Sequence, residues 1–487
     1  MTTSNDVSRQ PLQRPWLLAI PAVILLVSSA FFTLITPQLP SRMGRPSAQL
    51  VDDIGFWREV DRLPLPFLHD RQAVATLIVL VTALSFASYA LAIFLCRRYS
   101  PGRAAYRIVL ATTIVLFALS LLSLPTINSD IYMYLMQGRL VTEYGQNPHY
   151  VVPDRFPFDP MYAFTTAQYS RNVSDYLPVW TWVSVFSTWL AADNVVTELL
   201  MLRLLLVVVN IANLTLIAAI MRRLNPRYEL AAMMIYGWNP LVMIYGASKP
   251  DTVMVFFALL GIWALLSQRS RLTPVFLTLS VLVKMISAPL MIIYVLQYAR
   301  WRQWRALASA VFIAGITALL VYAPLVEGPQ IFVHHLSQLN RAGSTLPPAL
   351  RLLILALFVA LILWIGLTRD GSVRSWVNGS AWALFYFGIF MARPSLGWYL
   401  ITLIALVAVS GNRWLVWFTT ALTSAAFLLT IWENISNDVF KLPELPGQRF
   451  FVYIGIVIGG AVVIASMRGV RRMIATSSRQ LLLKRGL

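Results

Sequence analysis

Apolar runs of about 20 residues, almost free of charge, recur along this 487-residue sequence. An α-helix needs a run of that length to cross the hydrocarbon core of a bilayer, whereas a water-soluble core does not need the repeat. Only 12% of the residues are charged, about half the fraction typical of soluble domains. The first run, 16–36, is too long for the apolar part of a signal peptide and lacks a small-residue cleavage site, which favours a retained anchor. The pattern predicts an all-α, polytopic membrane protein.

Hydropathy predicts about twelve spans and one membrane domain, 1–487. The expected spans lie near 16–36, 73–95, 105–124, 194–220, 229–247, 251–267, 306–325, 347–367, 376–391, 397–410, 413–432 and 450–467. Within the single domain we distinguish a large outer loop at 125–193, a motif-bearing module at 194–300, and C-terminal helices with a basic tail at 301–487. No long polar block divides these parts, so a second domain is not predicted.

The formal net charge of +19 could indicate a nucleic-acid partner, but the position of the basic residues indicates otherwise. They concentrate in the loops that the trace places in the cytoplasm. These are Arg97, Arg98, Arg103 and Arg107; Arg222, Arg223 and Arg227; Arg300, Arg302 and Arg305; and Arg468, Arg471, Arg472, Arg479, Lys484 and Arg485. This is the positive-inside pattern, which orients a protein in the cell membrane. We therefore expect a lipid bilayer and no nucleic acid as partner.

Two apolar stretches do not fit ordinary spans. The basic loops 97–107 and 222–227 are both expected in the cytoplasm, so an even number of crossings must separate them. Three apolar stretches lie between the two loops, so the shortest, 178–192, is predicted to be a juxtamembrane helix on the outer surface. The stretch 272–298 also lies between two basic loops, and it is too short to cross twice at 1.5 Å per residue. We expect a re-entrant hairpin with Lys284 near its tip, lining a cavity that opens on the outer side.

Asp130 is the strongest catalytic candidate from its position alone. It follows the outer end of an expected span and stands among Tyr132, Tyr134 and Tyr144. A partly desolvated carboxylate there could act as a general base, and aromatic rings suit stacking against sugars. Residues 128–130 are also good N-caps for a helix at 131–144, which would be a structural role. Spacing leaves both roles open.

Short motifs follow one another in a defined order between Asp130 and Leu296, with one more near residue 398. They are Ser129-Asp130-Ile131-Tyr132-Met133-Tyr134, Asn147-Pro148-His149-Tyr150, Tyr176-Leu177-Pro178-Val179-Trp180, Arg203, Arg222-Arg223-Leu224-Asn225-Pro226, Trp238-Asn239-Pro240-Leu241, Gly246-Ala247-Ser248-Lys249-Pro250-Asp251, Lys284 with Pro289, and Trp398-Tyr399-Leu400. This series resembles the GT-C superfamily of integral-membrane glycosyltransferases. It looks most like the bacterial polyprenol-phosphomannose-dependent mannosyltransferases. Lys249-Pro250 stands where that family's motif has His-Asn.

The resemblance implies inverting transfer of a sugar, expected to be mannose, from a polyprenyl-phosphate donor to a glycan or lipid-linked acceptor on the extracytoplasmic face. It implies that Asp130 is the catalytic base. It also implies two further groups of site residues. The donor phosphate would be bound by Lys284, Arg393, Arg341 and Lys249, and the sugar or acceptor by Asp251, Asp175, Tyr132, Tyr134 and Trp398. No cofactor is implied, with a divalent cation as the alternative.

Structural roles stand beside these assignments. Lys284 could snorkel to a headgroup, Arg393 could end a helix, and Arg341 could be a solvated loop residue. Asp251 could complement a helix dipole and Asp175 could cap the helix at 178–192. The functional alternatives are a polymerase or ligase of lipid-linked glycans, or a lipid or solute transporter. The sequence contains no Walker, GxGxxG or HExxH motif, which argues against nucleotide-driven or zincin chemistry.

Overall fold

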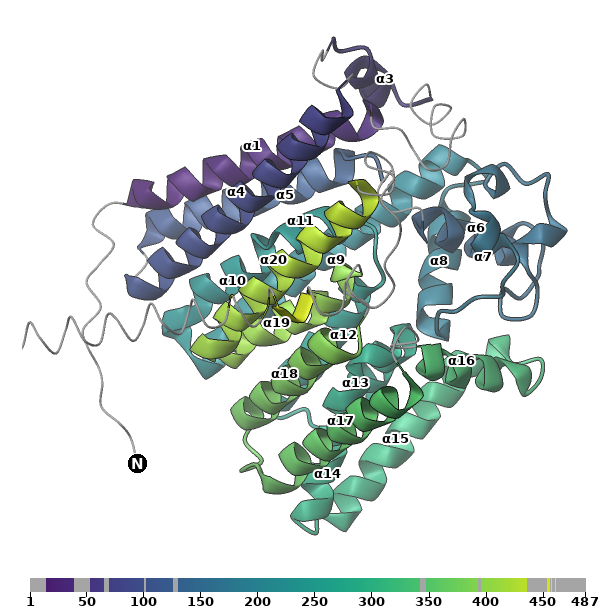
Figure 1. Cartoon of the computed structure of the whole chain (residues 1–487). Coiled ribbons are helices and arrows are strands. Elements are labelled where there is room, and N and C mark those ends of the chain that lie inside the picture. Colours follow the sequence, from purple (N-terminus) through teal and green to yellow (C-terminus); the bar gives the residue numbers. More distant parts are fainter. Residues whose placement is uncertain are drawn as a thin grey trace, which may run out of the picture.

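The computed structural model describes residues 15–38, 53–64, 70–99, 102–125, 130–341, 347–392 and 396–435, with a few positions between 453 and 460. Within these ranges every regular element is helical (Figure 1). The prediction of an all-α polytopic protein is confirmed.

Three long helices form a layer at the N-terminal side of the molecule. They are α1 (Ala19–Ile35), α4 (Arg71–Arg98) and α5 (Arg103–Leu122), drawn purple to blue in Figure 1. The carboxylate of Asp70 accepts hydrogen bonds from the first backbone amides of α4, which is why that helix begins there. The hydroxyl of Thr33 on α1 donates to a carbonyl of α5, 3.2 Å away, and so ties two of the layer's helices together.

The centre of the molecule is built on α9 (Val195–Leu224), a 30-residue helix. The chain returns along it in pieces: α10 (Glu229–Gly237), α11 (Pro240–Tyr245) and α12 (Asp251–Leu266). The break between α10 and α11 coincides with Asn239-Pro240, where the asparagine caps the new helix and proline occupies its first position. The predicted span 229–247 is therefore two short helices. This break allows the loop after α11 to enter the protein interior.

The predicted hairpin with Lys284 at its tip is confirmed. The helices α13 (Leu272–Val283) and α14 (Ala288–Arg300) have 12 and 13 residues, each too few to cross a bilayer. Tyr294 of α14 is hydrogen-bonded to Thr273 at the start of α13, so the second helix turns back along the first. Lys284 lies between the two helices and has an extended backbone conformation.

The remaining helices complete the bundle on the C-terminal side. They are α15 (Trp304–Tyr322), α16 (Gln330–Arg341), α17 (Pro348–Thr368), α18 (Val373–Phe390), α19 (Ile401–Ser410) and α20 (Arg413–Ile435), with the short 3-10 helix η9 (Gly397–Leu400) before α19. Every residue of α19 is buried, whereas α15 exposes a row of large apolar side chains. A polytopic protein places such a row against lipid.

Residues 130–190 form a lobe at one end of the helices, on the right of Figure 1. It contains α6 (Asp130–Thr142), α7 (Ala167–Ser170) and α8 (Pro178–Leu190). The helix α8 has only 13 residues and exposes Phe186 and Trp189, as a juxtamembrane helix would. A Cβ on Gly138 of α6 would lie 2.7 Å from the carbonyl oxygen of Ser184, so glycine permits the close crossing of α6 and α8.

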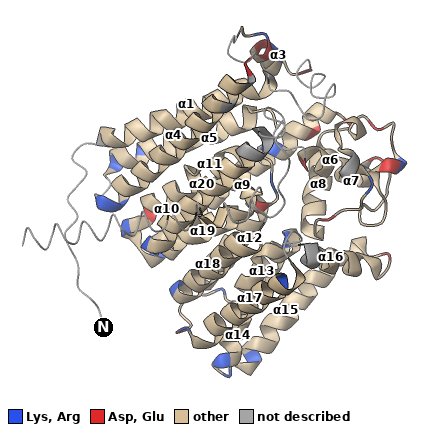
Figure 2. Ribbon diagram, viewed as in Figure 1, with Lys and Arg blue, Asp and Glu red and all other residues tan. Residues whose placement is uncertain are grey.

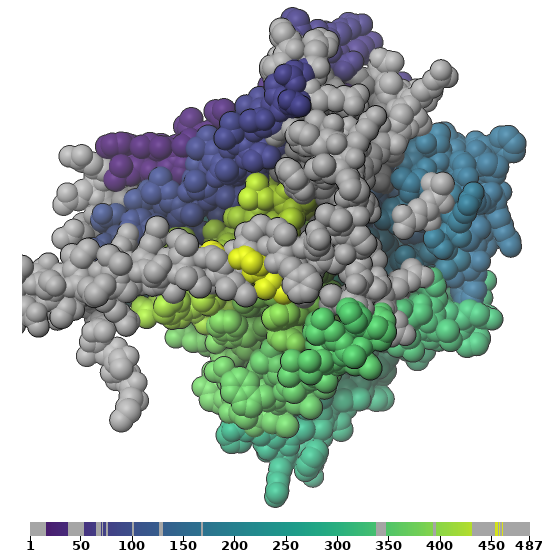
Figure 3. Space-filling model, in the orientation of Figure 1, coloured from purple at the N-terminus to yellow at the C-terminus, as the bar shows by residue number. Residues whose placement is uncertain are grey.

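The lobe also rests on the C-terminal helices. Figure 3 shows its blue surface meeting the green segment around α16. The amide of Asn147 donates to the carbonyl of Leu325 at 2.8 Å, and the hydroxyl of Tyr150 donates to that of Gly328 at 2.7 Å. The lobe is therefore a fixed part of the molecule.

Six helices among the described residues are long and apolar enough to span a membrane. They are Trp16–Ile35, Gln72–Arg98, Arg103–Leu122, Val195–Leu224, Trp304–Leu325 and Pro348–Thr368. Shorter apolar helices lie at Asp251–Leu266, Leu272–Val283, Met285–Arg300 and Gly397–Ser410. Most of the expected span 450–467 is outside the described residues. In the described part of the chain, long spans thus surround a core of short and broken apolar helices.

Many of the lysines and arginines lie at helix ends far from the lobe (Figure 2). The ends of α4 and α5 carry Arg98 and Arg103, and the turn between α14 and α15 carries Arg302. This distribution matches the loops that the positive-inside rule assigns to the cytoplasm. It predicts that the lobe faces the opposite side of the membrane.

Cysteine labelling in intact cells tests this orientation. Phe158 in the lobe is 98% exposed, and Ser270 is exposed in the turn between α12 and α13. In a background without Cys96, Phe158→Cys should react with a membrane-impermeant maleimide in intact cells, and Ser270→Cys only after lysis. The reverse pattern would overturn the orientation. Ser174 is an unsuitable probe because its side chain is buried against Gln137.

Candidate active site

Asp130 forms a part-buried ion pair with Lys249. Asp130 is the first residue of α6, and Lys249 lies in the loop between α11 and α12. The ammonium nitrogen of Lys249 is 2.5 Å from Oδ2 of Asp130, and the lysine side chain is fully buried. The same ammonium lies 3.5 Å from the ring centroid of Trp398, a cation–π contact. A residue of the lobe is thus bound directly to the helical core.

A second ion pair stands next to the first. Asp251, the first residue of α12, pairs with Lys284 at the tip of the hairpin, with 3.0 Å between carboxylate oxygen and ammonium nitrogen. The Lys284 ammonium lies 3.9 Å from the ring centroid of Tyr399. The charge of Lys284 also acts on Asp130 and on Lys249. Asp130, Lys249, Asp251 and Lys284 therefore form one group of four charges with no net charge, which we name the charge quartet.

A buried polar network holds the loop that carries Lys249 and Asp251. The amide of Asn210 on α9 donates to the carbonyl of Gly246 at 3.0 Å, and that of Asn213 donates to the carbonyl of Thr252 at 3.0 Å. Tyr236 links the two asparagines. A Cβ at residue 246 would lie 2.4 Å from a carbonyl oxygen, so only glycine fits there. The loop is thus clamped to the middle of α9 at both ends.

The environment of Asp130 keeps its carboxylate ionised. Burial raises the pKa of Asp130, but the adjacent Lys249 ammonium, the hydrogen bond from Tyr169 and the charge of Lys284 together outweigh burial and hold the pKa below its ordinary value. The hydroxyl of Tyr134 lies 3.5 Å from the carboxylate and 2.8 Å from the hydroxyl of Tyr176. Tyr169 also hydrogen-bonds Asp130. An ionised carboxylate among phenols and a tryptophan is suited to accept a proton from a hydroxyl.

The structure brings most of the predicted site residues together. Lys284, Lys249, Asp251 and Trp398 meet in or on the quartet, and Tyr134 borders it. Tyr132 does not: it is fully buried and stacks on Phe164 at 5.4 Å between ring centroids. Asp175 bonds His334, with 3.0 Å between carboxylate oxygen and Nε2.

Two predicted phosphate ligands are not placed by the structure. Arg393 lies outside the described residues, and Arg341 is described only as the last helical position of α16. Their roles stay predictions.

Arg203 is a buried cation to which the sequence motifs give no chemical role. It lies on α9, is 3% exposed, and donates to the carbonyl of Ser120. Among the described residues its Nε has no hydrogen-bond partner, and neither has the hydroxyl of Tyr245. Both side chains line a 30 Å³ cavity beside Ser248, the neighbour of Lys249. An arginine in an apolar span was the available signal, because such a charge is expensive unless it has a function.

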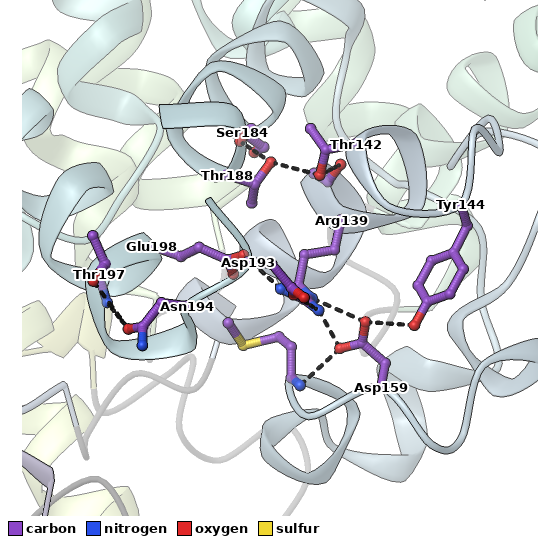
Figure 4. A network of polar contacts seen from close by, with 12 residues as sticks. Arg139, Thr142, Tyr144, Asp159, Ser184, Thr188, Asp193, Asn194, Thr197 and Glu198 are labelled. Atoms are coloured by element: carbon purple, nitrogen blue, oxygen red, sulfur yellow. Dashed lines mark hydrogen bonds and ion pairs between the residues drawn. The ribbon is translucent and has the colours of Figure 1, made fainter. Parts of the chain in front are cut away.

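A second charged network fixes the other end of α6 (Figure 4). Arg139 is 2% exposed and bonds Asp159 at 2.9 Å, Asp193 at 2.6 Å and Glu198 at 2.6 Å. These carboxylates come from the lobe's loop, the turn after α8 and the start of α9. Tyr144 adds a hydrogen bond to Asp159 at 2.8 Å. Arg139 therefore joins three segments and holds α6, with Asp130 at its opposite end, against the core.

The histidines of this region make packing contacts. The rings of His149 and His335 meet edge to face at 5.1 Å, and Nε2 of His149 is 3.0 Å from the hydroxyl of Thr181. Burial lowers the pKa of His149 to about 3 and that of His335 to about 4, so both are neutral at physiological pH. Within the described ranges no three His, Cys, Asp or Glu side chains are arranged to hold a metal ion.

Removing the Arg139 charge should destabilise the fold. Arg139→Gln leaves buried carboxylates without their counter-ion, and breaking a buried ion pair from one side typically costs about 3–5 kcal/mol. We expect a clearly lower thermal unfolding temperature in detergent. Arg171→Gln is the matched control, because Arg171 is 77% exposed and stands 3.7 Å from Asp154; it should unfold like the wild type. Equal effects of the two changes would contradict the role of Arg139.

Comparison with known proteins gives a family for this arrangement. Residues 54–300, more than half of the chain, match the family model described as alpha-(1→6)-mannopyranosyltransferase, N-terminal domain. Alpha-(1→6)-mannopyranosyltransferase A of Mycobacterium tuberculosis is 28% identical over 240 residues, which cover 46% of this chain and 44% of the relative. The matched region includes α6, α8, α9 and the entire charge quartet. The chain belongs to the alpha-(1→6)-mannopyranosyltransferase family.

Proposed function

We propose that this protein transfers mannose from a polyprenyl-phosphate donor to a hydroxyl of a glycan or lipid-linked acceptor, with inversion, on the extracytoplasmic face of the membrane. The carrying observation is the ionised Asp130, held in a site of buried charges and aromatic rings within a mannosyltransferase family. The name of the related Mycobacterium tuberculosis protein, a mannopyranosyltransferase, supports mannose as the transferred sugar. The basic helix ends far from the lobe support the extracytoplasmic side.

In this mechanism Asp130 accepts the proton of the acceptor hydroxyl as the oxygen attacks the anomeric carbon. The new bond forms between that oxygen and the carbon. The bond between the carbon and the phosphate oxygen breaks, and its electron pair leaves with the polyprenyl phosphate. Attack from the face opposite the phosphate inverts the configuration. A positioned general base contributes about 10²–10⁴-fold to such a step.

Lys249 couples the proton transfer to the departure of the phosphate. While Asp130 is ionised, the Lys249 charge is neutralised at 2.5 Å. Once Asp130 takes the proton, the quartet changes from neutral to a net charge of +1. That uncompensated charge appears as negative charge accumulates on the leaving phosphate, and a low-dielectric site strengthens their attraction. Lys249 is thus a positioning group for the base before the reaction and an electrostatic stabiliser during it.

Aromatic residues provide surfaces for the sugar. Trp398 and Tyr399 from η9 lie over the two lysines, and Tyr134 and Tyr176 border the carboxylate of Asp130. Flat aromatic faces suit the apolar faces of a hexose, and the phenol hydroxyls suit its hydroxyl groups. Asp251 would accept hydrogen bonds from the sugar while it remains paired with Lys284.

Arg203 is the best placed cation for the donor phosphate. Both quartet lysines are neutralised by carboxylates, whereas the guanidinium of Arg203 has an Nε without a partner in the described part of the chain. It faces a cavity shared with Tyr245 and adjoining the Lys249 loop. A buried guanidinium binds phosphate oxygens well because its N–H groups match their geometry.

The main test is Asp130→Asn in purified protein supplied with polyprenyl-phosphomannose. Asparagine keeps the shape and capping ability of aspartate but cannot take the proton. Release of polyprenyl phosphate should fall about 10²–10⁴-fold while the KM for the donor stays near the wild-type value. Asp154→Asn, a partly exposed carboxylate of the same lobe, is the matched control and should turn over normally.

The pH profile separates a base from a structural acid. Because the Asp130 pKa is held below its ordinary value, the wild-type rate should show no acidic limb near neutral pH. Lys249→Met removes the main group that lowers this pKa, so the pKa should rise and move the acidic limb towards neutral pH. A wild-type rate for Asp130→Asn, or a profile that Lys249→Met leaves in place, would refute the assignment.

Changing Arg203 tests the phosphate site. Arg203→Gln should raise the KM for the donor about ten- to hundredfold, the loss expected for one charge-assisted hydrogen bond of roughly 1.5–3 kcal/mol. Arg203→Lys keeps the charge and should recover part of the affinity. If Arg203 serves only to bond Ser120, Arg203→Gln will lower the unfolding temperature and leave the donor KM unchanged.

A further inference from the structure

A second cavity lies at the end of the hairpin far from the charge quartet. Its volume is about 240 Å³, it is partly open to the surface, and it is lined by α14, the turn after it, Leu265 of α12, and the loop between α17 and α18. Polar and aromatic side chains form most of its wall: Tyr294, Gln297, Tyr298, Trp301, Gln303 and Asp370. This cavity shares no residue with the site proposed for mannosyl transfer.

One buried group in the wall lacks a partner. Gln297 is 8% exposed, and among the described residues its Nε2 makes no hydrogen bond. A buried amide donor without a partner is unfavourable, and other atoms of the same side chain line the cavity. Tyr294 and Tyr298 add hydroxyls 2.9 Å apart. The wall therefore offers both donors and acceptors to a ligand.

A glycine keeps the cavity open beside Trp301. Gly371 has φ +78°, a left-handed conformation that suits glycine, and a Cβ there would lie 3.0 Å from Nε1 of Trp301. A larger residue would press on the indole that forms this wall. The indole of Trp301 thus retains an accessible face next to the amides and the Asp370 carboxylate.

The rim of the cavity is cationic. The guanidinium of Arg300 lies 5.0 Å from the ring centroid of Trp301 and donates to the carbonyl of Arg369, the residue before Asp370. Figure 2 shows further basic residues at the ends of α14 and α15. Ring faces with amides and a carboxylate suit a polyhydroxylated group, and a guanidinium at the rim suits a phosphate.

We propose that this cavity binds a polyhydroxylated phosphate, with the hydroxyl-bearing ring inside and the phosphate at Arg300. Two sources carry this chemistry: the headgroup of a polyol phospholipid in the adjoining leaflet, and a soluble sugar or inositol phosphate. Trp301 and Trp304 are 53% and 60% exposed at this end of the helices, as residues at a membrane interface are. A bound polyol would join α14 of the hairpin to the loop at residues 369–372.

Two tryptophans three residues apart supply a matched test. The full-length protein would be placed in phosphatidylcholine nanodiscs containing either phosphatidylinositol or phosphatidylserine, and retained lipid measured by native mass spectrometry. We expect retention of phosphatidylinositol to exceed that of phosphatidylserine about tenfold, the ratio for 1.4 kcal/mol. Trp301→Ala and Gln297→Leu should abolish the preference, and Trp304→Ala should keep it, because Trp304 is outside the cavity wall.

Two outcomes would overturn the proposal. Equal retention of the two anionic lipids would mean that charge alone is recognised, and equal loss in Trp301→Ala and Trp304→Ala would mean a general interfacial effect. Inositol 1-phosphate added to the detergent-solubilised protein distinguishes the sources: saturable binding lost in Gln297→Leu supports the cavity and assigns a soluble ligand. Unfolding temperatures of all variants, measured in parallel, separate loss of the site from loss of the fold.

Discussion

The ion pair between Asp130 and Lys249 is the contact on which the proposed active site depends. It joins the first residue of α6 in the lobe to a loop in the middle of the helical core. Lys249 is fully buried and depends on Asp130 for its counter-ion. The position of the lobe over the core is therefore tied to the same charges that the proposed reaction uses.

The helix α6 is held at both ends by such pairs. Asp130 bonds Lys249 at its start, and Arg139 bonds three carboxylates near its end. Gly138 brings the helix close to α8 between these points. A catalytic carboxylate needs a position fixed within a fraction of an ångström, and a helix clamped in this way supplies it. The asparagine network around Gly246 provides the same rigidity on the opposite side of the pair.

Part of this architecture could be predicted from local sequence properties. The hairpin around Lys284 and the short helix α8 follow from segment length and from the sign of the flanking loops, which are properties of single segments. Asp130 could be singled out because it follows a span. Its partner could not, since Asp130 and Lys249 are 119 positions apart and their contact depends on how α6 packs. The same holds for Arg139 and Arg203, whose hydrogen-bond partners only the packing reveals.

The identity of residue 249 has a consequence for the proposed chemistry. Where this chain has Lys249-Pro250, the motif of the resembling mannosyltransferases has His-Asn. A histidine beside Asp130 would change its charge near neutral pH, and its pairing with the carboxylate would change with it. The buried ammonium of Lys249 instead pairs with an ionised Asp130 and stacks on Trp398. In the proposed reaction, protonation of Asp130 by the acceptor would leave the charge of Lys249 free to attract the departing phosphate. A lysine at this position would thus link the two halves of the proposed transfer, deprotonation of the acceptor and release of the phosphate, through a single contact.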